Sequence, residues 1–218
     1  MRVFFIYYCI IIIGYDIIFK KEDIMKAVDK LPDNYVEIFS VDLQNNKKIA
    51  LLVNVLAMVI AGIMVAAMSF YVPVSGMFNT DGDIGYLLLK ASAFIVLIIL
   101  YLCLHELVHG AAMKMCGTKK IKYGFTGMYA FAGSDDYYYK KPYIFIALAP
   151  VVLWGIVLAV INCFVPSDWF WIIYFIQIIN ISGAAGDFYV TVRFIYMPDD
   201  ILIRDYGTSM FVYSQNHK

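Results

Sequence analysis

Residues 87–115 read LLLKASAFIVLIILYLCLHELVHGAAMKM, an apolar run long enough to cross a bilayer as a helix. The run contains the motif His105-Glu106-Leu107-Val108-His109. Two imidazoles four residues apart project from the same face of a helix, so both can reach one tetrahedral metal ion. Glu106 directly follows the first imidazole and can address a water molecule on that metal. The motif has the H-E-x-x-H pattern that is typical of zinc peptidases.

Composition makes a chance match improbable. The chain contains only three histidines and three glutamates. Shuffling a chain of this composition would produce the motif roughly once in two thousand trials, which favours a real site. The alternative is a pair of core histidines whose nitrogens are satisfied by hydrogen bonds. Uncompensated ionisable groups in a membrane span are costly and usually functional, which argues against that alternative.

The composition as a whole is that of an integral membrane protein. Of the 218 residues, 62% are hydrophobic, and the mean hydropathy is +0.74. These values exceed those of a soluble domain. Four runs are long enough to be spans, namely residues 49–74, 87 to about 115, 143–165 and 169–192. The sequence therefore predicts an all-α membrane protein with about four transmembrane helices.

Loop charges predict the orientation of these spans. Lysines are concentrated before the first span, in residues 20–48, and after the second, in residues 114–141, whereas the two other connections carry none. By the positive-inside rule the lysine-rich segments and both chain ends face the cytoplasm, which favours the cell membrane as the location. The net charge is zero, so no nucleic-acid partner is indicated.

The segments outside the spans predict four regions. Residues 1–24 form an apolar N-terminal segment that is either an anchor, a fifth span or a mis-assigned start, since Met25 begins a plausible alternative. Residues 25–48 form a cytoplasmic lead-in, 49–192 the four-helix membrane core and 193–218 a loosely held cytoplasmic tail.

Three shorter features lie in or beside these regions. Residues 35–43 alternate partly like a short strand, although a surface linker is the alternative. Cys116-Gly117 is typical of a helix C-cap. Residues 121–132 are rich in glycine and in residues that favour strands, which predicts a short β-hairpin or a re-entrant loop at the cytoplasmic face. The four cysteines lack the spacing of a zinc knuckle.

A catalytic zinc site needs a third protein ligand besides His105 and His109. His217 lies near the end of the polar tail, and Glu22 and Glu37 are remote in sequence. Asp187 follows the start of its span by roughly the same number of residues as His105, so the two reach a similar depth.

Small residues around Asp187, in the stretch 180–187, would allow close helix approach. We therefore predict Asp187 as the third ligand, the alternative being that it only marks the interfacial end of its helix. Asn180 could orient a metal ligand, hydrogen-bond substrate backbone or make a helix contact.

From about residue 31 to residue 192 the chain resembles the putative zincin peptidase family of small membrane proteins, whose architecture is similar to a reduced site-two protease. The resemblance rests on residues 31–35 (LPDNY), the H-E-x-x-H helix and Gly186-Asp187. It implies Zn²⁺ at His105, His109 and Asp187, with Glu106 as the general base. Site-two proteases usually present Asp-Gly within a proline-containing segment, whereas this chain has Gly-Asp without those prolines.

The expected function is hydrolysis of a peptide bond near the cytoplasmic membrane face, with a membrane protein or peptide as the substrate and the lipid bilayer as the surroundings. The alternative is a non-catalytic metal-binding membrane protein with a role in transport or assembly. The position of Glu106 and the lack of an internal repeat favour the peptidase.

Overall fold

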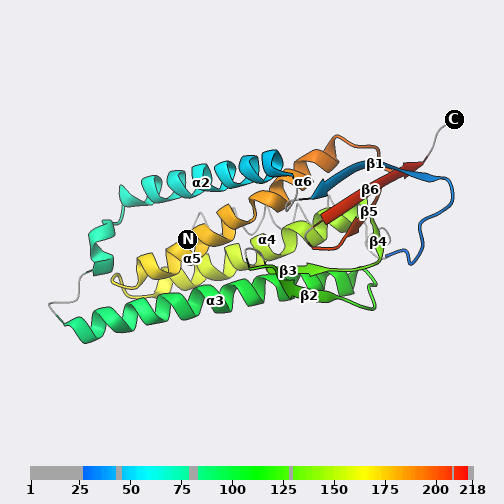
Figure 1. The fold of residues 1–218 in the computed structure, drawn as a ribbon. Helices are drawn as coiled ribbons and strands as arrows, with labels where there is room; N and C mark the ends of the chain where they lie inside the picture. The colour runs from blue at the N-terminus through cyan, green and yellow to red at the C-terminus, as the bar shows by residue number, and fades with distance from the viewer. Residues whose placement is uncertain (1–26, 43–45, 79–82, 128–129, 208, 216–218) are drawn as a thin grey trace.

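The computed structural model is a bundle of long helices with β-sheets gathered at one end (Figure 1). It describes residues 27–42, 46–78, 83–127, 130–207 and 209–215. The predicted N-terminal segment 1–24 lies outside the described residues.

Within the described residues, four helical stretches are long and apolar enough to cross a membrane, as the sequence predicted. The helices are α2 (Lys47–Ser69), α3 (Ile84–Met115), α4 (Lys140–Phe164), α5 (Phe170–Gly183) and α6 (Ala185–Ile195), with a short 3₁₀ turn η1 (Val74–Phe78) after α2. The fourth stretch, Phe170–Ile195, is not one continuous helix, because it breaks at Ala184 between α5 and α6. The break falls within the run of small residues 183–186, which the sequence analysis associated only with close packing.

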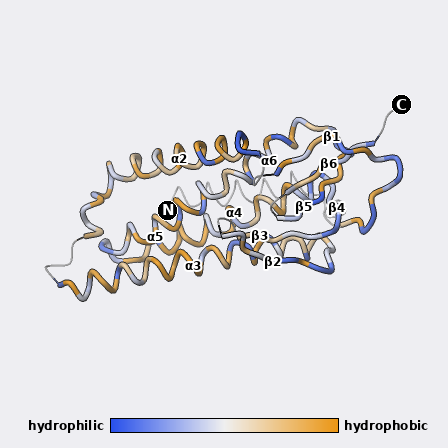
Figure 2. Tube along the Cα trace, in the orientation of Figure 1, coloured by the Kyte–Doolittle hydropathy of each residue, from blue (hydrophilic) through white to orange (hydrophobic). Residues whose placement is uncertain are grey.

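The helices are hydrophobic over most of their length (Figure 2), and many of their large apolar side chains are exposed. No residue of α2 is buried, and Leu51 and Ile63 are 65% and 63% exposed. A water-soluble bundle would bury such faces, since each exposed aliphatic side chain forgoes about 1.5–3 kcal/mol of burial free energy. These surfaces therefore match a hydrocarbon environment.

Both ends of α3 have the expected capping contacts. The side chain of Asp83 accepts a hydrogen bond from the Tyr86 backbone N–H at 3.2 Å. At the other end Cys116 is the C-cap, and Gly117 follows with φ of +93°, a left-handed conformation that glycine adopts without strain. The predicted cap at Cys116-Gly117 is confirmed. The 32-residue helix is about 48 Å long, so it can extend beyond a hydrocarbon core of about 30 Å.

The sheet end is larger than the sequence predicted. Strands β1 (Tyr35–Asp42), β6 (Ser209–Gln215), β5 (Leu202–Asp205) and β4 (Tyr137–Tyr139) form an antiparallel sheet in that order. Strands β2 (Lys122–Phe125) and β3 (Ala130–Gly133) form a separate hairpin. The predicted strand near residues 35–43 and the predicted hairpin near 121–132 are both confirmed.

Two predictions are wrong at this end of the molecule. The fold is mostly helical, but it has a four-stranded sheet besides the predicted hairpin, and residues 202–205 and 209–215 are not a loose tail but the strands β5 and β6. In β6 the buried residues Met210, Val212 and Ser214 alternate with half-buried ones, which is the period of a strand with one face on a core. Residues 210–213 (MFVY) are themselves apolar, and the sequence analysis missed the strand because it took residues 193–218 together as one tail.

The main core joins the ends of the helices to the sheet. It includes Met113 from α3, Ile146 from α4, Phe194 from α6, and Ile203 and Val212 from the sheet. A smaller cluster around Tyr101, Leu158 and Ile176 lies within the bundle. The sheet is thus packed onto the helix ends and holds their relative positions.

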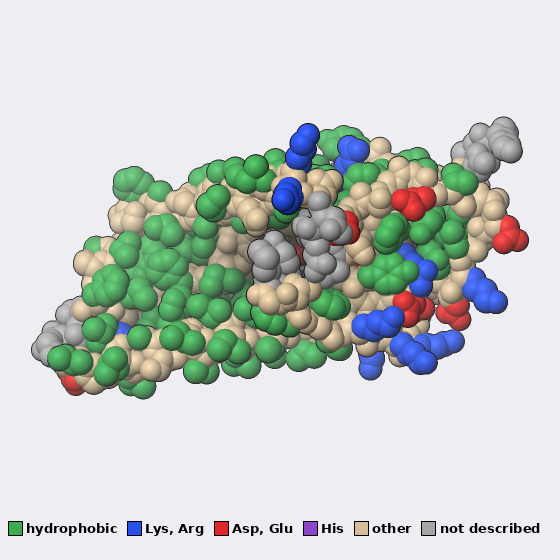
Figure 3. All heavy atoms as spheres, in the orientation of Figure 1, with side chains coloured by type: hydrophobic (Ala, Val, Ile, Leu, Met, Phe, Trp, Pro, Cys, Tyr) green, Lys and Arg blue, Asp and Glu red, His purple; other side chains and the backbone are tan. Residues whose placement is uncertain are grey.

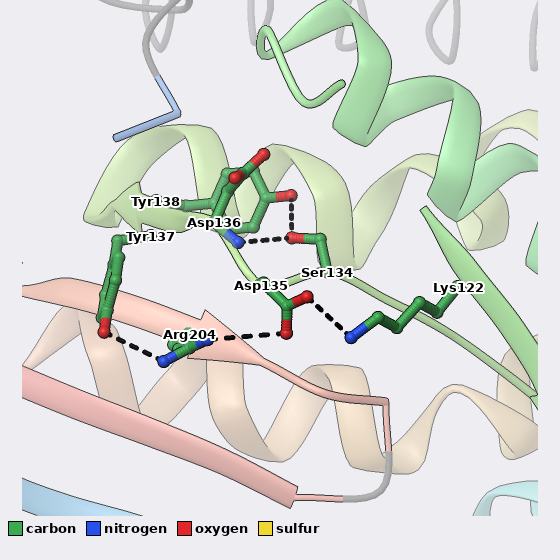
Figure 4. Close-up of polar contacts among 7 residues, drawn as sticks. All are labelled: Lys122, Ser134, Asp135, Asp136, Tyr137, Tyr138 and Arg204. Atoms are coloured by element: carbon green, nitrogen blue, oxygen red, sulfur yellow. Dashed lines mark hydrogen bonds and ion pairs between the residues drawn. The ribbon is translucent and has the colours of Figure 1, made fainter. Parts of the chain in front are cut away.

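A polar network connects the hairpin to the four-stranded sheet (Figure 4). Asp135 accepts from Lys122 at 2.6 Å and lies 3.5 Å from Arg204, which also donates to the Tyr137 hydroxyl at 3.1 Å. Lys122 beside Asp135 lowers the pKa of that carboxyl. Tyr138, which is fully buried, forms hydrogen bonds through its hydroxyl to the hydroxyl of Ser134 at 2.6 Å and to that of Thr118 at 2.5 Å.

We expect Tyr138→Phe to lower the free energy of unfolding by about 1–3 kcal/mol, because it leaves two buried hydroxyls without their shared partner. Thermal unfolding in detergent measures the effect. Tyr139→Phe is the matched control, since Tyr139 is 41% exposed and should change little. Equal melting temperatures for Tyr138→Phe and the wild type would contradict the importance of this network.

Candidate metal centre

The H-E-x-x-H residues lie on α3, about 32 Å along the helix from its first residue and close to the sheet end. One ligand atom from each of His105, Glu106 and His109 can be chosen so that all three lie within 4.8 Å of one another. The two imidazole rings are 5.0 Å apart between centroids and nearly perpendicular, at 75°. The helical spacing therefore brings the three side chains together as the sequence predicted.

The ring of His109 is held by a backbone carbonyl of α4. Its Nδ1 lies 2.9 Å from the oxygen of Ile146. A carbonyl oxygen only accepts, so Nδ1 of His109 carries the proton and donates. In the neutral ring Nε2 then has a free lone pair. A hydrogen bond at one nitrogen with the other left for the ion is the usual arrangement of a metal-ligating histidine.

The ring of His105 is held through a side-chain relay that crosses the bundle. Its Nδ1 lies 2.8 Å from the hydroxyl of Tyr101, which donates to Oδ1 of Asn180 at 2.9 Å. Nδ2 of Asn180 in turn donates to the carbonyl of Val151 at 3.1 Å. Because the Tyr101 proton is committed to Asn180, the hydroxyl accepts from His105 Nδ1, and Nε2 is again left free.

The predicted role of Asn180 can now be specified. Asn180 and Tyr101 are 0% and 5% exposed. Asn180 orients the ring of His105 indirectly, and it is also a contact between helices. The sequence analysis missed Tyr101, although its position four residues before His105 on an apolar helix places the two side chains on one face.

Asp187 lies in the first turn of α6, directly after the break at Ala184. Its Oδ2 is 3.9 Å from Nε2 of His109. Two ligand atoms on one tetrahedral zinc ion are about 3.3 Å apart, so a displacement of about 0.6 Å would let both bind the same ion. Asp187 is outside the compact group of three but faces the same cavity. The depth argument therefore predicted that Asp187 lies close to the histidines, whereas its binding to the metal stays a prediction.

The side chains surround a cavity of about 170 Å³. A second cavity of about 110 Å³ adjoins it toward α2 and the sheet. Both are lined by a shared set of residues from α4, α6 and the β5–β6 turn, namely Tyr143, Gly186, Asp187, Asp205 and Gly207. Among the described residues lining the larger cavity there is no lysine or arginine.

Asp205 is a further carboxylate at the site that sequence reasoning missed. Its Oδ2 accepts from the Tyr143 hydroxyl at 2.5 Å and its Oδ1 from the Gly207 backbone N–H at 2.7 Å. Burial raises the pKa of Asp205, while these two hydrogen bonds oppose the rise. The turn needs Gly207, whose φ is +90°. No motif marked Asp205, because it reaches the cavity only through the pairing of β5 with β6.

The donor set suits a divalent cation. Three carboxylates, those of Glu106, Asp187 and Asp205, line the same cavity as the two histidines. These half-buried carboxylates repel one another unless a cation balances them, and no basic side chain among the described lining residues does so. Two imidazoles with free Nε2 atoms plus carboxylate oxygen are ligands that zinc prefers.

Of the other candidates from the sequence, Glu37 is exposed on β1 and does not line the cavity. Glu22 and His217 lie outside the described residues. The β-hairpin, in contrast, lies against the site. Residues 130–132 of β3 line the cavity, and the backbone of Ala132 donates a hydrogen bond to the Glu106 carboxylate.

Residues 98–202 match a family model described as putative zincin peptidase. The matched segment contains His105, Glu106, His109 and Asp187. It ends at the first residue of β5, three residues before Asp205. No curated protein and no solved structure matches the chain.

We expect Tyr101→Phe to weaken binding of a divalent metal by about tenfold to a hundredfold, because His105 loses the acceptor that orients it. Competition with a chromogenic chelator on the detergent-solubilised protein measures the dissociation constant. Tyr174→Phe is the matched control, since that hydroxyl bonds the carbonyl of Met64 at 3.2 Å, away from the cavity. An unchanged affinity in Tyr101→Phe would show that the relay does not support the site.

Proposed function

Because residues 98–202 match the zincin peptidase family, we propose that this chain is a zinc-dependent peptidase whose active site lies within a membrane-embedded helical bundle. The observation that carries the proposal is the arrangement around α3. His105 and His109 each have Nδ1 hydrogen-bonded within the protein and Nε2 left free for a metal ion.

We assign the zinc ligands to His105, His109 and Asp187. These three side chains leave a fourth position open, which is the difference between a catalytic and a structural zinc site. Zinc bound there would supply a Lewis acid that acidifies water and polarises the scissile carbonyl. The hydrogen bonds of the two histidines to Ile146 and Tyr101 keep the rings in one orientation while substrate enters and leaves.

Glu106 is the general base in this proposal. It adjoins His105 in sequence, and its carboxylate is within the same compact group as both imidazoles. It accepts a proton from the attacking water and later delivers it to the leaving amine nitrogen. The hydrogen bond from the Ala132 backbone holds the carboxylate in place, so that the hairpin takes part in positioning the base.

The outer edge of β3 suits an extended substrate. Strand β3 pairs with β2 on one side, and Ala132 directs its N–H to Glu106 on the other, so this second edge faces the cavity. A peptide laid along that edge would gain backbone hydrogen bonds and bring a carbonyl beside the metal. A transmembrane helix must first unwind, because its carbonyls are already bonded.

The distribution of charge supports an orientation in a cell membrane in which the sheet end faces the cytoplasm. Lysine and arginine side chains gather around the sheets, and apolar side chains cover the opposite part of the molecule (Figure 3). By the positive-inside rule the sheet end faces the cytoplasm. The active site then lies near the cytoplasmic leaflet, where a membrane protein or a membrane-bound peptide would be cleaved.

We expect Glu106→Gln to retain zinc and to lose about 10²- to 10⁴-fold in cleavage rate, because the base is removed while the ligands stay. The assay compares zinc content with hydrolysis of a membrane-tethered reporter. Glu37→Gln is the matched control, because Glu37 is exposed on β1. Undiminished cleavage by Glu106→Gln would overturn the assignment of Glu106 as the base. If the wild type binds zinc but does not cleave the reporter, the result would favour a non-catalytic metal-binding protein.

We expect Asp187→Asn to bind well below one zinc ion per chain at concentrations that saturate the wild type, since the neutral amide is a weaker ligand than the carboxylate. Atomic absorption after gel filtration measures the stoichiometry. Asp199→Asn is the control, because the Asp199 side chain is 98% exposed. Full zinc occupancy in Asp187→Asn would remove Asp187 from the ligand set and direct attention to Asp205.

A further inference from the structure

Helix α4 contains a proline in its interior. Pro150 is the eleventh residue of a helix of 25 residues and is buried. Proline has no backbone N–H, so the carbonyl four residues earlier receives no helical hydrogen bond, and the ring pushes that carbonyl away from the helix axis. For Pro150 this carbonyl is that of Ile146.

The carbonyl of Ile146 is the group that orients His109. Its oxygen accepts from Nδ1 of His109 at 2.9 Å, across the interface between α3 and α4. Ile146 is 1% exposed. Without this contact both a carbonyl and an imidazole N–H would be buried without a partner, which costs free energy on each side. Pro150 lacks the backbone N–H that would bond the Ile146 carbonyl, and Nδ1 of His109 supplies a donor in its place.

The same turn of α4 also holds the second histidine. The carbonyl of Val151, the residue after Pro150, accepts from Asn180 at the end of the relay to His105. Both imidazoles thus take their orientation from carbonyls of the segment 146–151. A kink at this point of α4 would move both acceptors together.

We propose that Pro150 is a positioning residue of the metal centre, which acts by freeing the Ile146 carbonyl to fix His109 with Nε2 toward the ion. The inference rests on the proposed function only in taking His109 as a metal ligand. In Pro150→Ala the restored N–H of residue 150 reclaims the Ile146 carbonyl, and His109 must share or lose its acceptor. The tautomer with the proton on Nε2, which cannot bind metal through that atom, then becomes populated.

A role confined to helix packing makes the opposite prediction about stability. If Pro150 only shaped α4, its replacement would change metal binding and stability in the same direction. If it acts through the carbonyl, Pro150→Ala should raise the melting temperature, since alanine suits a helix interior far better than proline, and should still weaken metal binding. Pro150→Gly restores the same N–H, so its metal affinity should fall as much as that of Pro150→Ala. Its gain in stability should be smaller, because glycine suits a helix interior less well than alanine.

The first experiment measures the metal-free wild type, and a variant is needed only to assign the signals. Histidine labelled with ¹⁵N gives signals from only three residues, His105, His109 and His217, and the His109 signals are identified by their loss in His109→Gln. At a pH where the ring is neutral, we expect the ¹⁵N shifts of His109 to report a protonated Nδ1 and a bare Nε2. A proton on Nε2 in the wild type would overturn the inference.

The second experiment measures zinc dissociation constants and melting temperatures for the wild type, Pro150→Ala, Pro150→Gly and Pro142→Ala. Pro142 is the matched control, because it is the third residue of α4 and its replacement reclaims no carbonyl within the helix. We expect binding to weaken about tenfold to a hundredfold in both Pro150 variants and less than about twofold in Pro142→Ala.

Unchanged zinc affinity in the Pro150 variants, or equal losses in Pro142→Ala, would overturn the inference. The result is separable from the proposed peptidase activity. A wild type that binds zinc without cleaving the reporter would refute the peptidase activity. The tautomer of His109 and the effect of Pro150 on zinc affinity would still be measured, because neither readout depends on cleavage.

Discussion

In an apolar bundle, an imidazole that uses one ring nitrogen for a metal ion cannot depend on bulk water to satisfy the other. The second nitrogen must find an acceptor within the protein, and helices α3, α4 and α5 provide the acceptors. His109 uses the Ile146 carbonyl of α4, and His105 uses Tyr101 of its own helix and, through it, Asn180 of α5. These contacts bind α3, α4 and α5 to one another where apolar packing alone has little directional preference.

Two interruptions of regular helix structure serve the same site. Pro150 leaves a carbonyl of α4 without a helical hydrogen bond. The break at Ala184 separates α5 from α6, so that Asp187 lies in the first turn of a new helix beside the cavity. Irregular backbone inside a membrane is tolerated where it borders a cavity or is buried in protein, and both interruptions meet that condition. The positive end of the α6 dipole also favours a carboxylate in its first turn.

The sheets complete the site from the other side. Strand β3 brings the Ala132 N–H to Glu106, and the β5–β6 turn brings Asp205. The four-stranded sheet contains strands from both ends of the described chain, since β1 pairs with β6. Residues 98–202, which match the zincin peptidase family, therefore do not contain the whole cavity: Gly207 lies beyond the matched segment.

Patterns that are local in sequence were sufficient for the spans, the α3 motif, strand β1 and the hairpin, because apolar length, helical spacing and alternation each depend on neighbouring residues. Depth along two spans was also sufficient to bring Asp187 near His109. Strands β5 and β6 were missed because such short runs, although partly apolar, become strands only when a partner strand and a core are present.

By itself, the sequence determined that residues 49–192 hold four apolar runs long enough to cross a membrane, and that two imidazoles share one face of a helix with a carboxylate beside the first. Only the tertiary structure decided which way the imidazoles point, which carbonyl each ring depends on, and that Asp205 joins the cavity. The physical reason is that a hydrogen bond between helices is set by the position of both backbones to within about 0.5 Å, and no pattern within a single segment carries that information.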